Sequence, residues 1–203
     1  MKVLGLTGPS GAGKGYVCAL FADHGIPSID CDAVYHALLV PPSACVEALA
    51  ERFGKAILRA DGSLDRKALG DRVFADPAEL AALNAITHRF VLDRVREMLA
   101  ELRAGQTPPP AVLVDAPALY ESGFDAECDF VVAVLADRKT RASRIMARDH
   151  LTAEAAERRL AAQHPDDFYT APARFTLYND GDGSALEAQL APVLTAIREG
   201  GSV

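Results

Sequence analysis

The sequence contains no apolar run near the roughly 18 residues that cross a bilayer. Its start, MKVLGLTG, has neither the apolar region nor the small-residue cleavage site of a signal peptide. The four cysteines are scattered without C-x-x-C spacing, which argues against a zinc site and against a disulfide framework. These absences predict a cytoplasmic protein with no membrane partner.

A surplus of positive charge is also missing, because the formal net charge is −7. Nonspecific binding to nucleic acid needs such a surplus to displace counterions, so nucleic acid is not an expected partner. The basic residues are nevertheless concentrated, and a solvated helix face is the simplest interpretation of their cluster. Seven of the 21 lie within one short segment: Arg138, Lys139, Arg141, Arg144, Arg148, Arg158 and Arg159.

Five short apolar segments alternate with helical patterns along the chain. Continuous apolar runs of this kind are typical of strands in a sheet that helices cover on both faces. We therefore expect an α/β fold with a parallel sheet and with ligands at the carboxyl ends of its strands. The expected strands are KVLGLT (2–7), IPSID (26–30), AVLVD (111–115), FVVAVL (130–135) and FTLYN (175–179).

Two helical stretches interrupt this alternation. Residues 33–105 have helical periodicity without a good strand, which predicts a helical insertion that covers the substrate. The basic segment, about 138–163, is expected to form two helices joined near Leu151, with Thr152 as an N-cap. The predicted core then consists of residues 1–32 and 106–203.

The stretch GPSGAGKG, Gly8 to Gly15, fits the pattern G-x-x-x-x-G-K-[ST] except at its last position. Glycines in such a loop let backbone N–H groups turn toward a phosphate at the N-terminus of the following helix. Lys14 adds a charge for the β- and γ-phosphates. The loop follows an expected strand and precedes an expected helix, which favours a nucleotide site over a glycine-rich turn with a surface lysine.

Gly15 stands where a Ser or Thr hydroxyl normally binds Mg²⁺ directly, and Tyr16 is not an evident substitute. Magnesium keeps several waters in most nucleotide sites and is held partly by the substrate phosphates. The loop also resembles that of adenylate kinases, which have glycine after the lysine. We therefore expect ATP and Mg²⁺ as cofactors, with the metal held through water and phosphate and without a direct protein ligand.

Two aspartates, Asp30 and Asp32, follow the second expected strand. Residues i and i+2 of an extended segment face the same way, so both carboxylates are expected to point toward the site. The alternative is structural, because Asp32 precedes AVYHALL and could cap the helix that begins there.

With these elements the chain resembles the dephospho-CoA kinase family over nearly its whole length. The similarity lies in GLTGPSGAGKG, IDCD, DGSLDR, DAPALYESG and SRIMARDHLTAEAAERRLAAQ, which occur in the family's order. The chain departs from the family pattern at Gly15, Tyr16, His36 and Arg89, and again in HPDDFYTAPARF.

The resemblance implies a P-loop kinase that phosphorylates the ribose 3′-hydroxyl of dephospho-coenzyme A with ATP, the last step of coenzyme A biosynthesis. It implies catalytic roles for Asp32 as the base, Lys14 and Arg144. It also implies that the basic segment, about 138–163, is a mobile lid whose Arg144 and Arg148 share one helix face. The implied ATP-binding residues are Gly8, Gly11, Ala12, Gly13, Lys14, Gly15, Tyr16, Arg144, Arg148 and Asn179. The implied substrate-binding residues are Asp30, Asp32, Arg66, His88, Leu119, Glu121 and Arg159.

Two other functions remain open from the residues alone. The sequence GAGKG favours a nucleoside monophosphate kinase. Gly15 and Tyr16 favour a regulatory ATP-binding protein that has lost catalysis. Asp32 and the lid arginines argue against the second alternative, because a sensor needs neither.

Overall fold

The computed structural model describes residues 1–181 and 184–199. The chain divides into two compact units, one formed by Met1–Ile29 with Arg103–Val203 and the other by Asp30–Leu102. Each unit has a hydrophobic cluster of its own. No helix within the described residues combines the length and the apolar character needed to cross a membrane.

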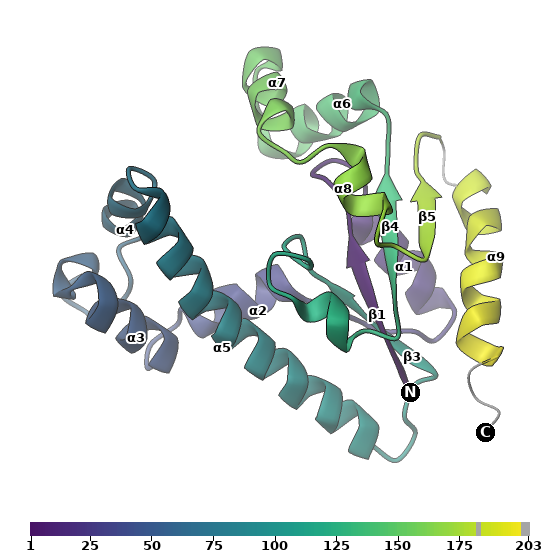
Figure 1. The fold of residues 1–203 in the computed structure, drawn as a ribbon, viewed down its shortest axis with the longest axis horizontal. Coiled ribbons are helices and arrows are strands. Elements are labelled where there is room, and N and C mark those ends of the chain that lie inside the picture. Colours follow the sequence, from purple (N-terminus) through teal and green to yellow (C-terminus); the bar gives the residue numbers. More distant parts are fainter. Residues whose placement is uncertain (182–183, 200–203) are drawn as a thin grey trace. The chain divides into compact units, whose positions relative to one another are not determined.

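The first unit is built on a five-stranded sheet with the order β2-β3-β1-β4-β5 (Figure 1). β1 pairs in parallel with both β3 and β4, and β4 pairs in parallel with β5. The predicted α/β fold is confirmed, because all five expected segments form strands. They are β1 (Lys2–Thr7), β2 (Ser28–Asp30), β3 (Ala111–Asp115), β4 (Phe130–Leu135) and β5 (Phe175–Tyr178).

Side chains of β1 alternate between the two faces of the sheet. Leu4 and Leu6 belong to a buried cluster that also contains residues of α1 (Lys14–Asp23) and α9 (Ser184–Glu199). Gly5, between them, faces the other way, and a Cβ there would lie 2.7 Å from Cδ2 of Leu119. The sheet is thus covered on both faces, which explains why its strands are continuous apolar runs.

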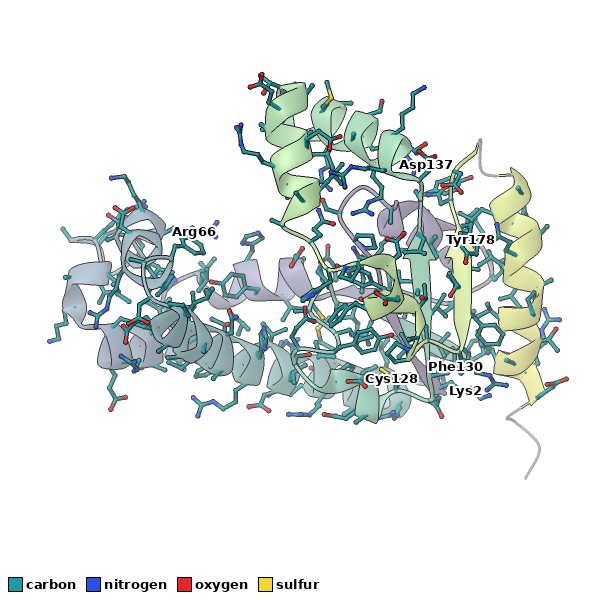
Figure 2. All side chains as sticks on the ribbon, turned by 45° about the horizontal axis from the view of Figure 1, so that its top comes forward. Lys2, Arg66, Cys128, Phe130, Asp137 and Tyr178 are labelled. Atoms are coloured by element: carbon teal, nitrogen blue, oxygen red, sulfur yellow. The ribbon has the colours of Figure 1, made fainter. Side chains whose placement is uncertain are left out.

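The carboxyl ends of the strands carry the loop after β1 and the lid. Figure 2 shows Lys2 and Phe130, which begin β1 and β4, at one end of the sheet. Asp137 and Tyr178 lie at the other end (Figure 2). Because β1 lies between β3 and β4, the loop that leaves β1 begins where the strand order reverses, the usual place of ligands in such sheets.

The basic segment forms the expected helix pair, α6 (Arg138–Asp149) and α7 (Ala153–Ala161). His150 ends α6 with a left-handed φ of 53°, and Thr152 Oγ1 accepts a hydrogen bond from the N–H of Ala155, so the predicted N-cap is confirmed. Buried side chains of both helices form a small cluster. Three further elements were not predicted: the 3-10 helix η2 (Phe124–Glu127), helix α8 (Asp166–Thr170) and helix α9.

The second unit is helical, as its periodicity predicts. Phe53 and Leu69 lie in its buried cluster, against which Ile86 and Phe90 of the long helix α5 pack. Ser43 caps one helix through the N–H of Val46. The elements are α2 (Cys31–Leu38), α3 (Ala44–Phe53), the 3-10 helix η1 (Lys55–Ile57), α4 (Arg66–Val73) and α5 (Pro77–Ala104).

Candidate functional site

The loop between β1 and α1 has a backbone that requires glycine. Gly8, Gly11 and Gly13 have φ values of 144°, 83° and 91°, which other residues rarely adopt. A Cβ at Gly11 would lie 2.8 Å from the carbonyl oxygen of Arg141, and a Cβ at Gly13 would overlap the side-chain amide of Asn179. Both the shape of the loop and the closeness of its neighbours therefore exclude larger residues.

Lys14 begins α1 and folds back across this loop. Its Nζ donates a hydrogen bond of 3.1 Å to the carbonyl oxygen of Gly8. The first turn of α1 carries no acidic residue, so no carboxylate offsets the positive end of the helix dipole. Backbone, helix terminus and lysine together suit a phosphate group.

Asn179 and Arg144 donate hydrogen bonds to backbone carbonyl oxygens of this loop. Asn179 follows β5, is only 4% exposed and donates from Nδ2 to the carbonyl oxygen of Ala12 at 2.9 Å. Arg144 Nη1 donates to the carbonyl oxygens of Gly11 and Ala12, both at 3.3 Å, while its Nη2 donates to Asn179 Oδ1 at 3.4 Å. Both residues were predicted at the nucleotide, and both contact the loop that would bind it.

A second set of contacts at Ser10 was missed from the sequence. Gln163 Oε1 accepts from the N–H of Ser10 at 2.8 Å, and Arg141 donates to the same oxygen and to the Ser10 carbonyl, at 2.9 and 3.2 Å. Arg141 is 7% exposed. Its pKa is lowered by this burial, although the carboxylate of Asp166, 3.4 Å away, acts in the opposite direction. Arg141 precedes Arg144 by three residues on α6, so the helical spacing alone places it on the same face.

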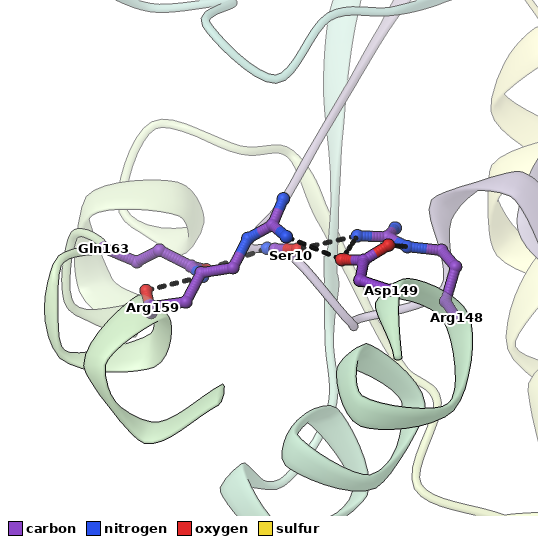
Figure 3. A network of polar contacts seen from close by, with 5 residues as sticks. All are labelled: Ser10, Arg148, Asp149, Arg159 and Gln163. Atoms are coloured by element: carbon purple, nitrogen blue, oxygen red, sulfur yellow. Dashed lines mark hydrogen bonds and ion pairs between the residues drawn. The ribbon is translucent and has the colours of Figure 1, made fainter. Parts of the chain in front are cut away.

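Two further lid arginines, Arg148 and Arg159, meet at one carboxylate. Asp149 accepts from Arg148 and from Arg159, and Nη2 of Arg148 also lies 3.4 Å from Ser10 Oγ (Figure 3). The hydrogen bonds from both guanidinium groups lower the pKa of Asp149. The predicted ATP ligand Arg148 and the predicted substrate ligand Arg159 are therefore neighbours.

Polar side chains lie at the carboxyl ends of two neighbouring strands, β1 and β3. Thr7 ends β1, and its Oγ1 is buried with no hydrogen-bond partner among the described residues. Asp115 ends β3 directly beside β1, with Cys18 Sγ 3.9 Å from its Oδ2. Asp115 received no role from the sequence, although an acidic residue closing an apolar strand at this edge is a signal that could have been used.

Gly15, where the phosphate-loop pattern expects a hydroxyl, lies next to open space. No group of three His, Cys, Asp or Glu residues suitable for a metal ion occurs within 1–181 and 184–199. A Cβ at Gly15 would meet none of the described atoms within 4 Å, so there is room at this position for solvent. Tyr16, which follows, is 46% exposed.

In the second unit the two aspartates differ from the prediction. Asp30 is the N-cap of α2, and its Oδ1 accepts from the N–H of Ala33 at 3.0 Å. Asp32 lies inside the first turn of α2, not in an extended segment, so the argument that strand alternation aligns both carboxylates is wrong. The proposed cap role for Asp32 is also wrong, because Asp30 fills it. Asp32 itself is exposed.

The other predicted substrate residues lie in three places. Arg66 begins α4 and its Nη2 is 3.1 Å from Nδ1 of His36, while His88 is half-buried in α5. Leu119 is fully buried against Gly5, so its side chain contributes to the core. Glu121 Oε1 lies 3.4 Å from Nε2 of His164, and that imidazole stacks on Phe168 with a centroid distance of 3.9 Å.

Comparison with known proteins gives one consistent result. The family model described as dephospho-CoA kinase matches residues 2–185. A dephospho-CoA kinase of Anaeromyxobacter dehalogenans is 42% identical over 200 residues, covering 98% of this chain and 94% of its own. The crystal structure of TT1252 from Thermus thermophilus has a TM-score of 0.77 at 33% identity and covers 96% of this chain and 97% of its own. Shikimate kinase from Bacteroides thetaiotaomicron shares the fold, with a TM-score of 0.52 at 15% identity over 97% of this chain and 98% of its own.

Proposed function

Because the chain belongs to the dephospho-CoA kinase family, we propose that it transfers the γ-phosphoryl group of ATP to the ribose 3′-hydroxyl of dephospho-coenzyme A, the final step of coenzyme A biosynthesis. The observation that supports this most directly is the loop itself. Its three glycines with positive φ, the inward-folded Lys14 and the supporting pair Arg144 and Asn179 form a cradle for a triphosphate.

The cradle's positive groups would act on the transferred phosphoryl group. Lys14 Nζ can exchange the Gly8 carbonyl for β- and γ-phosphate oxygens, since its present partner is a single neutral acceptor. Arg144 lies against the loop at Gly11 and Ala12, and Arg148 lies beside Ser10. The transition state of phosphoryl transfer is loose and spreads charge over three oxygens, so positioned cations stabilise it.

Asp32 is proposed to be the proton acceptor. Its carboxylate is exposed on the first turn of α2, and Asp30 already satisfies the helix end, so Asp32 is available to a ribose hydroxyl. Arg66, beside His36, is proposed to bind the substrate, together with Asp30, His88, Glu121 and Arg159. Guanidinium groups suit the phosphate oxygens that this substrate carries.

Mg²⁺ is proposed to be held through water and the ATP phosphates. The open position at Gly15 leaves space for a water in place of the missing hydroxyl, and Asp115 at the end of β3 is the carboxylate proposed to orient such waters. The ion would neutralise charge on the β- and γ-phosphate oxygens.

Phosphoryl acceptors distinguish this function from its alternatives. We expect that, with MgATP, only dephospho-coenzyme A gains a phosphoryl group among dephospho-coenzyme A, AMP, CMP and shikimate, as measured by mass. Transfer to AMP or CMP without transfer to dephospho-coenzyme A would establish a nucleoside monophosphate kinase instead. ATP binding without transfer to any acceptor would favour the regulatory protein.

Gly15→Ser should retain activity and lower the Mg²⁺ concentration needed for half-maximal rate. The added side chain enters open space, and its hydroxyl can replace a water as a direct ligand. The measurement is initial rate against Mg²⁺ concentration at fixed ATP, with Gly15→Ala as the variant that adds a Cβ without the hydroxyl. If Gly15→Ser abolishes activity in a folded protein, the water-mediated account is wrong.

A further inference from the structure

One carboxylate in the lid, that of Asp149, binds two arginines from different helices. Oδ1 accepts from Nε of Arg148 at 2.8 Å, and Oδ2 accepts from Nη2 of Arg148 at 2.9 Å and from Nη1 of Arg159 at 2.6 Å (Figure 3). Arg148 belongs to α6 and Arg159 to α7. Asp149 therefore fixes the two guanidinium groups relative to each other.

The same network contacts the phosphate loop at a single residue. Nη2 of Arg148 lies 3.4 Å from Oγ of Ser10, and Gln163 joins the Ser10 N–H to the Arg159 carbonyl, which accepts from its Nε2 at 3.1 Å. Both arginines are thus connected to Ser10, one through its side chain and one through Gln163. Asp149 completes the connection between them.

Local structure does not explain an acidic residue at this position. Asp149 is the last residue of α6, where the helix dipole disfavours negative charge. Adjacent residues on a helix do not face each other, so the Arg148 side chain must turn back to reach Asp149 with two donors. An arrangement that α6 does not favour by itself indicates a role in the site that α6 faces.

The contact leaves part of the Arg148 guanidinium for a ligand. Its contacts among the described residues use Nε and Nη2, and none uses Nη1. A guanidinium carries five donors in a rigid fork, so one edge can remain on Asp149 while another meets a phosphate oxygen. Binding of ATP then does not require the Asp149 contact to break.

We propose that Asp149 is a positioning residue of the ATP site: it holds Arg148 beside Ser10, with Arg159 bound to the same carboxylate, before the nucleotide arrives. This inference rests on the proposed function. Long side chains lose rotamer freedom when a ligand orders them, and a carboxylate that orders them in advance removes that cost from binding. It also offsets the mutual repulsion of cations gathered around an empty phosphate site. Once bound, the triphosphate orients Arg148 itself, so Asp149 acts on ATP affinity more than on turnover.

Asp149→Asn should raise the KM and the Kd for ATP about tenfold and change kcat by less than about threefold. Asparagine retains one side-chain acceptor in place of two charged ones, so it cannot serve both arginines. The Tm should stay the same or rise, because the change removes negative charge from a helix C-terminus. Asp149→Glu keeps the charge and should recover most of the ATP affinity.

The matched control is Glu157→Gln. Glu157 accepts a hydrogen bond from Arg138 at 2.6 Å, so this carboxylate also joins α7 to α6. Both side chains of this pair are exposed, and Glu157 does not contact Arg148 or Arg159. Glu157→Gln should leave the KM for ATP unchanged. An equal increase in both variants would show that general lid packing is responsible and would overturn the proposal.

An unchanged or lowered KM for ATP in Asp149→Asn would also overturn the proposal. A lowered Tm with normal ATP affinity would overturn it too, because Asp149 would then have only a structural role. Lys14→Ala, measured in the same assay, separates this failure from that of the proposed function. If Lys14→Ala weakens ATP binding and Asp149→Asn does not, only the role of Asp149 is wrong. If Lys14→Ala has no effect, the loop is not the nucleotide site and both proposals fail.

Discussion

Asp32→Asn should lower kcat by roughly 10²-fold or more while ATP affinity stays within a few-fold of normal, the range expected when a positioned proton acceptor is lost. A ribose hydroxyl is a poor nucleophile while it is protonated, so a carboxylate must orient it and take its proton as the new bond forms. Asparagine preserves the size of the side chain and removes its charge and its basicity. Single-turnover rates with saturating ATP and dephospho-coenzyme A measure the effect.

The neighbouring Asp30 provides the structural comparison. Because Asp30 caps α2, Asp30→Ala removes a hydrogen bond from the N–H of Ala33 and should lower the Tm by a few degrees. Asp32→Asn leaves this cap intact, so its Tm should change less than that of Asp30→Ala. If Asp32→Asn melts several degrees lower and its folded fraction turns over normally, Asp32 is structural and Asp30 becomes the next candidate for the base.

Much of the fold follows from local patterns. β4 is buried along its whole length, and a strand covered on both faces must be a continuous apolar run, which is visible in FVVAVL. The lid helices are equally visible, because Thr152 is a cap residue placed before a helical pattern. The segment IDCD shows where local reasoning fails. α2 begins at Cys31 immediately after β2, with Asp30 as its N-cap, and the sequence pattern alone does not show that boundary.

The site is less predictable, because its contacts join distant parts of the chain. The loop glycines and Lys14 occur together in one motif and could be identified from it. Ser10, by contrast, meets Gln163 and Arg141 across 153 and 131 residues of sequence, and no local pattern encodes such a contact. Asp149 is hidden for a further reason, since an acidic residue within a basic helix ordinarily indicates a surface ion pair.

Gly8→Ala should destabilise the protein by about 3 kcal/mol or more and abolish measurable ATP binding. Gly8 is the first residue after β1, with a φ of 144°, and an added Cβ would overlap the carbonyl oxygen of Val134 in the adjacent strand β4. That oxygen belongs to the backbone of a fully buried strand, so it cannot move aside as a flexible side chain would. The loop must shift instead. The carbonyl oxygen of Gly8, which accepts a hydrogen bond from Lys14, shifts with the loop. Thermal unfolding and ATP titration calorimetry measure the two effects.

Gly25→Ala distinguishes backbone strain from this overlap. Gly25 also has a positive φ, 74°, but its Cβ would meet none of the described atoms within 4 Å. Gly25→Ala should therefore lower the free energy of unfolding only by the strain of the left-handed region, about 1–2 kcal/mol, and leave ATP affinity unchanged. For a chain of this size each kcal/mol lowers the Tm by roughly 2–4 °C, so the two variants should differ by several degrees. Equal losses of stability would mean that φ alone makes Gly8 necessary. Normal ATP binding by Gly8→Ala would mean that β1 and β4 can separate without disturbing the loop, and that the close approach of Gly8 to Val134 does not determine the shape of the phosphate site.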